Sequence, residues 1–298
     1  MIEIKTCQIC KNSDFVNYMQ SKDFSVTKET FNIVKCSSCN FVFTNPRPKK
    51  MDKYYDDESY ISHTNSSSTF FEKIYQSVRK IAIKQKFKLI SSYKKSGSIL
   101  DVGCGTGEFL NACKNGGWKT RGIEPSKKAR EKAITNYDLT IDESIILSKT
   151  NNTYDVITMW HVLEHVEKIN ETVSILSRLL ESKGQVIIAV PNLGSYDCSY
   201  YNKYWAAYDL PIHLSHFTKE TISSLFQKHN FKLVKTKGMV FDSFYVSLLS
   251  EEYKNGSKNF IKSFIVGCLS NLFGVFTKRG FSSAIYVFEK YSYKNYIQ

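Results

Sequence analysis

The 298-residue chain lacks several features that would assign it to a common class of protein. No stretch reaches the roughly 18 uninterrupted apolar residues of a membrane-spanning helix. The first residues, MIEIKTCQIC, contain no apolar core of signal-peptide length. We therefore expect a cytoplasmic protein whose thiols are reduced. Sustained repeats and RNA-binding signatures are also missing, so no specific nucleic-acid partner is predicted.

Acidic residues are also few. The chain has 28 Asp and Glu against 41 Lys and Arg, which gives a formal net charge of +13. This excess favours an anionic partner, such as a phosphate, a nucleotide-sugar or an acidic lipid surface. The lysines are scattered in pairs, however, as they also are on ordinary solvated faces. We predict a small anionic acceptor molecule, and the sequence gives no indication of the oligomeric state.

The cysteines near the N-terminus have the spacing of a metal site. Two C-x-x-C pairs contain Cys7, Cys10, Cys36 and Cys39. Each pair can place two thiolates on one tight turn, and four thiolates complete a tetrahedral shell around zinc. A closed shell leaves no position for water or substrate, so the zinc is expected to be structural; four unpaired thiols are the alternative. We predict a zinc-binding module over 1–48, a linker and amphipathic helix over 49–95, and a second domain over 96–298.

The segment SILDVGCGTGEFLNACKNGGW, residues 98–118, predicts a ligand cradle. An apolar strand leads into a turn with three glycines and then into a helix N-terminus. The glycine spacing differs from the dinucleotide pattern G-x-G-x-x-G, and Glu108 would repel a pyrophosphate. Glu124 ends the next strand, where a carboxylate can accept from two ribose hydroxyls. This pattern favours a nucleoside ligand that has a charged amino-acid end and no phosphates.

Strands and helices alternate through the rest of this domain. Residues 153–159 and 184–192 are expected to form buried strands, with an amphipathic helix over 169–180 between them. This alternation predicts an α/β fold with a doubly wound parallel sheet, in which ligands bind at the carboxyl ends of the strands. Residues 231–236 and 282–290 are expected to form the last two strands, separated by a helical insert around 241–280.

Four motifs resemble those of class I S-adenosylmethionine-dependent methyltransferases: LDVGCGTG, GIEP, YDVITMWHVLEHV and LLESKGQVIIAVPN. The cysteine pairs, the NPRP stretch and DLPIHLSHFT are similar to a bacterial group found among sugar and surface-polysaccharide enzymes. The resemblance implies a Rossmann-like sheet with an antiparallel last strand and S-adenosylmethionine as cofactor. It also implies methylation of oxygen or carbon on a nucleotide-linked sugar or glycan intermediate. The cofactor-binding residues implied by the resemblance are Asp101, Gly103, Gly105, Gly107, Glu124, Asp142, Trp160 and His161.

The stretch HVLEH, residues 161–165, has two interpretations. H-x-x-E-H can be the zinc signature of a metalloprotease, but a protease would need a distal carboxylate ligand and would leave the glycine turn without a purpose. In a methyltransferase, a base must take a proton from the acceptor. His165 is the first candidate, His213 and His216 are the next, and a structural hydrogen bond is the alternative for each. Glu164 could orient His165, or lie near a divalent cation as in ubiquinone-pathway O-methyltransferases.

Other functions stay open at this point. One is a ubiquinone-pathway-like O-methyltransferase that acts on an aromatic or lipid acceptor. Another is a non-catalytic partner of glycan-assembly enzymes that keeps the fold. Residues 259–276 form an apolar segment flanked by lysines, which could make peripheral contact with an anionic bilayer or could pack as a lid or dimer contact.

Overall fold

The computed structural model describes residues 1–54, 70–144 and 153–291, except for the side chains of residues 70–75. The expected linker therefore lies largely outside the described residues, as does most of the segment that follows Asp142. The chain divides into two compact units. One consists of Met1–Asp56, Leu163–Thr172 and Ala189–Tyr286, and the other consists of Asp57–Val162, Val173–Ile188 and Val287–Gln298. The boundaries predicted at residues 48 and 95 stay predictions.

The larger sheet confirms the predicted Rossmann-like α/β fold. It is a mixed seven-stranded sheet with the order β10-β11-β8-β7-β4-β5-β6. Its strands are β4 (Ser98–Val102), β5 (Lys119–Ile123), β6 (Ile141–Asp142), β7 (Tyr154–Trp160), β8 (Leu180–Pro191), β10 (Phe231–Gly238) and β11 (Ser283–Lys290). Strand β4 pairs in parallel with both β5 and β7, so their carboxyl ends lie at the same edge.

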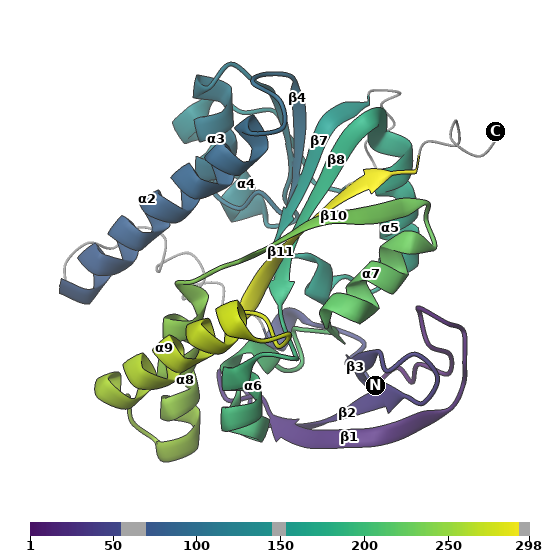
Figure 1. Cartoon of the computed structure of the whole chain (residues 1–298), viewed down its shortest axis with the longest axis vertical. Helices are drawn as coiled ribbons and strands as arrows, with labels where there is room; N and C mark the ends of the chain where they lie inside the picture. The colour runs from purple at the N-terminus through teal and green to yellow at the C-terminus, as the bar shows by residue number, and fades with distance from the viewer. Residues whose placement is uncertain (55–69, 145–152, 292–298) are drawn as a thin grey trace. The chain divides into compact units, whose positions relative to one another are not determined.

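Several helices of the described residues accompany this sheet, among them the four that follow in the chain from residue 70 to residue 179. They are α2 (Phe70–Ser91), α3 (Glu108–Asn115), α4 (Lys127–Tyr137) and α5 (Ile169–Leu179). Helix α2 packs beside α3 (Figure 1). The approach is close, because a Cβ on Gly116 at the end of α3 would lie 2.3 Å from the Phe87 ring. Long side chains of α2 can therefore reach the loop that precedes α3.

A second, four-stranded sheet follows the first cysteine pair, and its second strand ends at Cys36. Its order is β1-β2-β3-β9, and its strands are β1 (Phe15–Lys22), β2 (Thr30–Cys36), β3 (Val42–Thr44) and β9 (Ser215–His216). In the last pair, Val42 is opposite His216 and Phe43 is opposite Ser215. The sheet therefore includes residues far outside the predicted 1–48 module. A two-residue strand gives no periodic signal, so the sequence could not predict this pairing.

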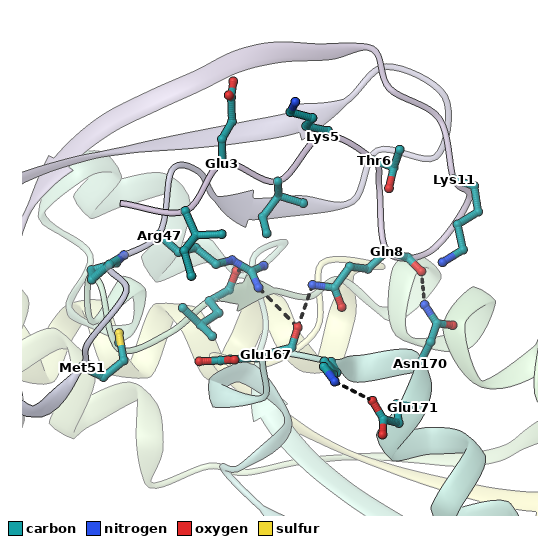
Figure 2. Close-up of a pocket in the computed structure, with 15 residues that line it drawn as sticks. Glu3, Lys5, Thr6, Gln8, Lys11, Arg47, Met51, Glu167, Asn170 and Glu171 are labelled. Carbon is teal, nitrogen blue, oxygen red and sulfur yellow. Dashed lines mark hydrogen bonds and ion pairs between the residues drawn. The ribbon is translucent and has the colours of Figure 1, made fainter.

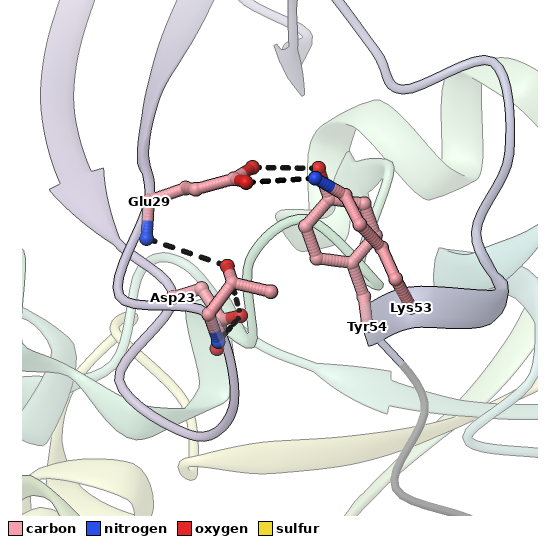
Figure 3. Close-up of polar contacts among 5 residues, drawn as sticks. Asp23, Glu29, Lys53 and Tyr54 are labelled. Carbon is pink, nitrogen blue, oxygen red and sulfur yellow. Dashed lines mark hydrogen bonds and ion pairs between the residues drawn. The ribbon is translucent and has the colours of Figure 1, made fainter.

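Polar contacts fix the chain around the β1–β2 turn (Figure 3). The buried carboxylate of Asp23 accepts from the backbone N–H of Val26 at 2.9 Å and of Thr27 at 2.6 Å. At the start of β2, Glu29 accepts from Lys53 Nζ and from the Tyr54 hydroxyl, each at 2.7 Å. These hydrogen bonds hold the pKa of Glu29 below its usual value and attach the 3₁₀ turn η1 (Asp52–Tyr54) to the hairpin.

Two helices lie in the region around 241–280, where the sequence predicts a helical insert. The helical elements between residues 189 and 286 are α6 (Tyr196–Tyr201), η3 (Asn202–Tyr204), η4 (Ala206–Tyr208), α7 (Lys219–Gln227), α8 (Asp242–Asn255) and α9 (Phe260–Phe276). Helices α8 and α9 lie side by side, and both contact α6 (Figure 1). Within the described ranges, no helix is long and apolar enough to span a bilayer.

Candidate active site

The glycine turn between β4 and α3 has a backbone that side chains would disturb. Gly103, Gly105 and Gly107 have φ values of 73°, 55° and 84°, which L-residues with a Cβ adopt at a cost. A Cβ on Gly103 would lie 2.3 Å from Val162, whereas a Cβ on Gly105 would meet nothing within 4 Å. The Gly103 N–H donates to the Ile123 carbonyl at 2.7 Å. The turn is thus fixed to the end of β5, with open space beside Gly105.

Glu124 lies directly after β5 and is almost completely buried. Its Oε2 accepts from the Gly105 N–H at 2.8 Å, and its Oε1 accepts from the Ser126 N–H at 2.9 Å. Burial raises the pKa of Glu124, and these two N–H groups act in the opposite direction. Each carboxylate oxygen keeps a second lone pair. The carboxylate can therefore hold the turn in place and still accept from two hydroxyl groups.

Asp101 and Trp160 end two neighbouring parallel strands. The carboxylate of Asp101 is buried and accepts from the Thr158 hydroxyl at 2.6 Å. Burial raises the pKa of Asp101 to about 7, although Thr158 and the charge of Lys86 lower it. The Lys86 ammonium also lies 4.5 Å from the centroid of the Trp160 ring. A buried carboxylate with a pKa near neutrality is typical of functional sites.

Two cationic side chains from α2 are site residues that sequence reasoning missed. One is Lys86, and the other is Arg79, which forms an ion pair with Glu108 at 2.6 Å. The sequence shows only the negative charge of Glu108, and the structure adds that Arg79 balances this charge. The sequence did contain a signal: Arg79 and Lys86 are seven residues apart, which places them on the same face of a helix.

Asp142 and His161, two further predicted cofactor residues, have fewer contacts that connect them to the glycine turn. The carboxylate of Asp142 forms a two-point ion pair with Arg121, with N–O distances of 2.6 and 3.0 Å. Its carbonyl accepts from the Glu124 N–H at 2.9 Å. His161 has a φ of 57°, and only Leu163–His165 form a single 3₁₀ turn, η2. The helix on which a metalloprotease would carry H-x-x-E-H is absent from these described residues, so the geometry argues against a peptidase.

The structure brings Glu164, His165 and His213 together. One potential ligand atom from each lies within 4.8 Å of the others, and the two imidazole rings meet edge to face at 4.6 Å. His213 Nδ1 is 2.9 Å from the Ala207 carbonyl. Since a carbonyl can only accept, Nδ1 carries the proton and a neutral His213 has its lone pair on Nε2. That nitrogen lies 3.9 Å from Asp209 Oδ2, and burial raises the pKa of Asp209 to about 6.

His216 lies outside this set and has a structural role in the sheet. Its Nε2 is 3.2 Å from the Thr44 hydroxyl, which itself donates to the His213 carbonyl at 2.9 Å. The hydroxyl proton is therefore used, so His216 Nε2 must be the donor to Thr44. Burial holds the pKa of His216 well below its usual value, which keeps the ring neutral. This hydrogen bond joins β9 to β3 and leaves the ring without the free lone pair at Nε2 that a base needs.

The four N-terminal cysteines converge in two similar turns. Lys11 N–H donates to the Cys7 carbonyl and Asn40 N–H to the Cys36 carbonyl, each at 3.0 Å. The φ values of Lys11 and Asn40 are 67° and 60°, so both turns close in the same way. All four Sγ atoms lie within 4.8 Å of one another, with Cys7–Cys39 at 3.5 Å and Cys10–Cys36 at 3.4 Å. Tetrahedral zinc with bonds of about 2.3 Å needs sulfurs about 3.8 Å apart, so the cluster fits the ion.

A cavity of about 550 Å³ lies in the first unit, between the N-terminal segment and residues 167–171 (Figure 2). Gln8 Nε2 donates to the Glu167 carbonyl at 2.8 Å across it. The guanidinium of Arg47 donates to the carbonyls of Thr44, Glu167 and Leu214. None of the predicted site residues lines this cavity. Among the described residues that line it, the buried cationic side chain is Arg47, which already donates to backbone carbonyls.

Comparisons with known proteins indicate the family and the fold of the chain. Residues 75–236 match the family described as "Methyltransferase domain". A ubiquinone biosynthesis O-methyltransferase of Pelagibacter ubique is 30% identical over 196 residues, which cover 60% of this chain and 80% of that protein.

Two solved structures share the fold. Magnesium protoporphyrin IX methyltransferase of Synechocystis PCC 6803 with bound SAH has a TM-score of 0.55 at 13% identity, and the match covers 82% of this chain and 100% of that one. A possible histamine N-methyltransferase of Thermotoga maritima has a TM-score of 0.51 at 16% identity, with 78% and 98% covered.

Proposed function

Since the chain belongs to the methyltransferase-domain family, it is an S-adenosylmethionine-dependent methyltransferase; we propose that the cradle between β4 and α3 binds this cofactor and that the methyl group is transferred to an oxygen or carbon atom of a small anionic acceptor. The arrangement of Gly105 and Glu124 carries this proposal. The Glu124 carboxylate accepts from the Gly105 N–H at 2.8 Å. The space beside Gly105 is open, because a Cβ there would meet nothing within 4 Å. A carboxylate with two spare lone pairs suits the two hydroxyls of a ribose.

Asp101 and Trp160 extend the cofactor site. In the proposal, the Asp101 carboxylate attracts the ammonium of the cofactor's methionine end, and Trp160 provides an apolar wall. Lys86 opposes the cost of burying Asp101, because its positive charge lowers the pKa of that carboxyl. The bound cofactor supplies an electrophilic methyl group on a sulfonium. The side chains align the two reactants and take the acceptor's proton.

His213 is the favoured base, and His165 is the second. His213 Nδ1 donates to the Ala207 carbonyl, so the neutral ring presents Nε2 as a proton acceptor. Asp209 lies 3.9 Å from this nitrogen, where a carboxylate stabilises the imidazolium that forms after proton transfer. Proton removal of this kind is needed for a hydroxyl acceptor, and one relative is named an O-methyltransferase. Oxygen is therefore the favoured atom, and a nucleotide-linked sugar or glycan intermediate is the proposed acceptor class.

Cation-assisted O-methylation of an aromatic or lipid acceptor is a second candidate. The observation that favours it is the spacing of Glu164, His165 and His213, whose ligand atoms lie within 4.8 Å of one another. A divalent cation there would lower the pKa of an acceptor hydroxyl. Turnover measured at an EDTA concentration that leaves the four-cysteine zinc and the thermal midpoint unchanged, and again with added Mg²⁺, separates the two candidates. Turnover that is unchanged in EDTA supports the base, and strict dependence on a cation supports the metal.

The acceptor is tested by incubating the protein with methyl-labelled S-adenosylmethionine and two sets of acceptors. One set contains nucleoside-diphosphate sugars, and the other contains prenylated catechols. Labelled product from the first set alone supports the glycan proposal. Product from the second set alone contradicts it in favour of the ubiquinone-type reaction, and no product from either set contradicts both acceptor classes.

Replacing His213 with alanine is expected to lower kcat about 10²- to 10⁴-fold, which is the usual contribution of a general base. S-adenosylhomocysteine affinity should change by less than about threefold, because no proposed cofactor contact is removed. The matched control is His229→Ala, a half-buried histidine whose Nε2 is bonded to Asn170 instead. Equal losses of kcat in both variants, or none in either, would rule out His213 as the base.

Binding of S-adenosylhomocysteine is expected to weaken below about pH 7. Burial raises the pKa of Asp101 from 3.8 to about 7, so the carboxylate is increasingly protonated below that pH and loses its attraction for the ammonium. The dissociation constant should rise about tenfold per pH unit once protonation dominates. Asp101→Asn should bind weakly at every pH, with a flat profile. Calorimetric titrations between about pH 6 and pH 8 measure both profiles, and a pH-independent intact protein would contradict the assignment.

The raised pKa of Asp101 affects the stability of the fold in the opposite direction from ligand binding. Folded Asp101 binds its proton more tightly than the unfolded chain does, since its pKa is raised from 3.8 to about 7. Its contribution to folding is therefore fully present below about pH 4 and is lost as the pH rises through about 7. Ligand binding and stability should thus respond to pH in opposite directions at this residue.

A further inference from the structure

Helix α9 has the reverse of the usual arrangement of a surface helix. Its buried residues include Ser263, Gly267 and Ser270, which are small or polar. Its outward face is large and apolar, with Ile261 77% exposed and Phe276 80% exposed. A helix at a water-facing surface normally buries its apolar stripe and exposes its polar one. Other side chains on the outward face are Phe264, Ile265, Leu272 and Val275, all more than half exposed.

The inward face of α9 is held by hydrogen bonds and close packing, so the helix is not expected to rotate and bury its apolar face. Ser243 of α8 donates to the Gly267 carbonyl at 3.2 Å, and Ser270 donates to Asp197 at 2.6 Å. A Cβ on Gly267 would lie 2.5 Å from the Phe244 ring, so α8 and α9 approach closely only because glycine is there. Small residues between helices and large apolar residues outside are typical of helices in contact with lipid.

The charges around α9 complement an anionic surface. Lys258 and Lys262, at the N-terminal end of the helix, form ion pairs with Glu252 at 3.6 Å and with Glu251 at 3.2 Å. Lys278 and Arg279 follow the helix at its other end, and residues 259–282 contain no Asp or Glu. Basic residues beside an apolar face attract phospholipid headgroups. The helix has 17 residues, about 25 Å at 1.5 Å per residue, which is shorter than the hydrocarbon core of about 30 Å. With one side packed on α8 and α6, it can only lie along a bilayer.

We propose that the outward face of α9 docks on an anionic phospholipid bilayer, with the helix in the plane of the interface. Hydrogen bonds join α9 to the segment that orients His213. Asp197 accepts from Ser270 and from Trp205 Nε1, the latter at 2.8 Å. Trp205 begins the turn that contains Ala207, whose carbonyl accepts from His213. A lipid-linked acceptor would therefore meet a helix that is connected to the proposed base. The docking itself does not depend on the proposed reaction.

Flotation of the full-length protein with vesicles tests the docking. Vesicles of phosphatidylcholine with an equal part of phosphatidylglycerol are compared with vesicles of phosphatidylcholine alone. The intact protein should float with the anionic vesicles, and Ile261→Gln, Val275→Gln and Phe276→Gln together should reduce the bound fraction at least about tenfold. The matched control replaces three apolar residues exposed elsewhere, Val16, Ile134 and Val234, with glutamine. This control should float as the intact protein does.

Calorimetry with S-adenosylhomocysteine separates a failure of docking from a failure of folding or of the proposed function, because none of these substitutions touches the cofactor turn. The proposal is supported if the α9 variant binds the ligand normally and no longer floats. It is overturned if the intact protein ignores anionic vesicles, or if neutral vesicles bind it equally well. A dimer in sedimentation velocity that the α9 substitutions dissociate, together with no flotation, also overturns it and assigns the face to a second copy of the chain.

Discussion

Replacing Glu124 with alanine is expected to weaken S-adenosylhomocysteine binding at least about 100-fold. Two hydrogen bonds from the ligand's ribose to this carboxylate are lost, and each hydrogen bond to a charged group contributes about 1.5–3 kcal/mol. The substitution also removes the acceptor of the Gly105 and Ser126 N–H groups, so the turn itself loses its anchor. Isothermal titration calorimetry on the purified variant measures the change. A Kd within about threefold of the intact protein's would contradict the proposed cofactor site.

The matched control for this variant is Asp155→Ala. Asp155 Oδ2 accepts from the Ser98 N–H at 2.8 Å, so it also holds backbone by a carboxylate, but at the opposite end of β4. Its loss should lower the thermal midpoint and leave ligand affinity unchanged. If both variants lose affinity equally, the effect of Glu124→Ala is general destabilisation rather than a lost contact. Glu124→Gln, which preserves the volume but not the charge, should have intermediate affinity.

Replacing Cys36 with serine is expected to abolish zinc binding and to lower stability by about 3–5 kcal/mol. Metal binding in a four-cysteine site stabilises the folded state directly, because the unfolded chain has no preformed site. For a chain of this size, this loss corresponds to a fall in Tm of about 10 °C. Elemental analysis should find one zinc per intact chain and none in the variant.

The control for the zinc prediction is Cys268→Ser, which removes a half-buried thiol outside the cluster. Its zinc content and Tm should match those of the intact protein. A strong chelator added to the intact protein should reproduce the loss of stability seen with Cys36→Ser and should have no further effect on that variant. An intact protein without zinc, or one that a chelator leaves unchanged, would contradict a structural metal.

The parts of the site that the sequence predicts are those defined within a few residues. The strand, the glycine turn and the helix after it follow one another directly, so Gly105 could be assigned to a cradle without a structure. Glu124 ends the next parallel strand, and neighbouring parallel strands end at the same edge of a sheet. The two cysteine pairs are likewise local turns. Each of these predictions depends on local pattern alone.

The roles of the histidines could not be predicted in this way. His213 and His216 are three residues apart in PIHLSHF, and nothing in that stretch distinguishes them. Their roles separate only through distant partners: the Ala207 carbonyl leaves His213 Nε2 as an acceptor, whereas Thr44 makes His216 Nε2 a donor. The partner of Arg79 could not be predicted for the same reason: the spacing from Lys86 indicates a shared helix face, but the ion pair with Glu108 joins segments that sequence patterns treat separately.

The pairing of β3 with β9 also has a consequence for biosynthesis. Val42 and Phe43 leave the ribosome early, but their partners Ser215 and His216 follow only after residues 44–214 have been translated. Until then β3 is an unprotected sheet edge, which is prone to pairing with other chains. Early zinc capture by the cysteines would keep the nascent hairpin compact during this interval. A truncated protein that ends before β9 should therefore aggregate even when zinc is supplied.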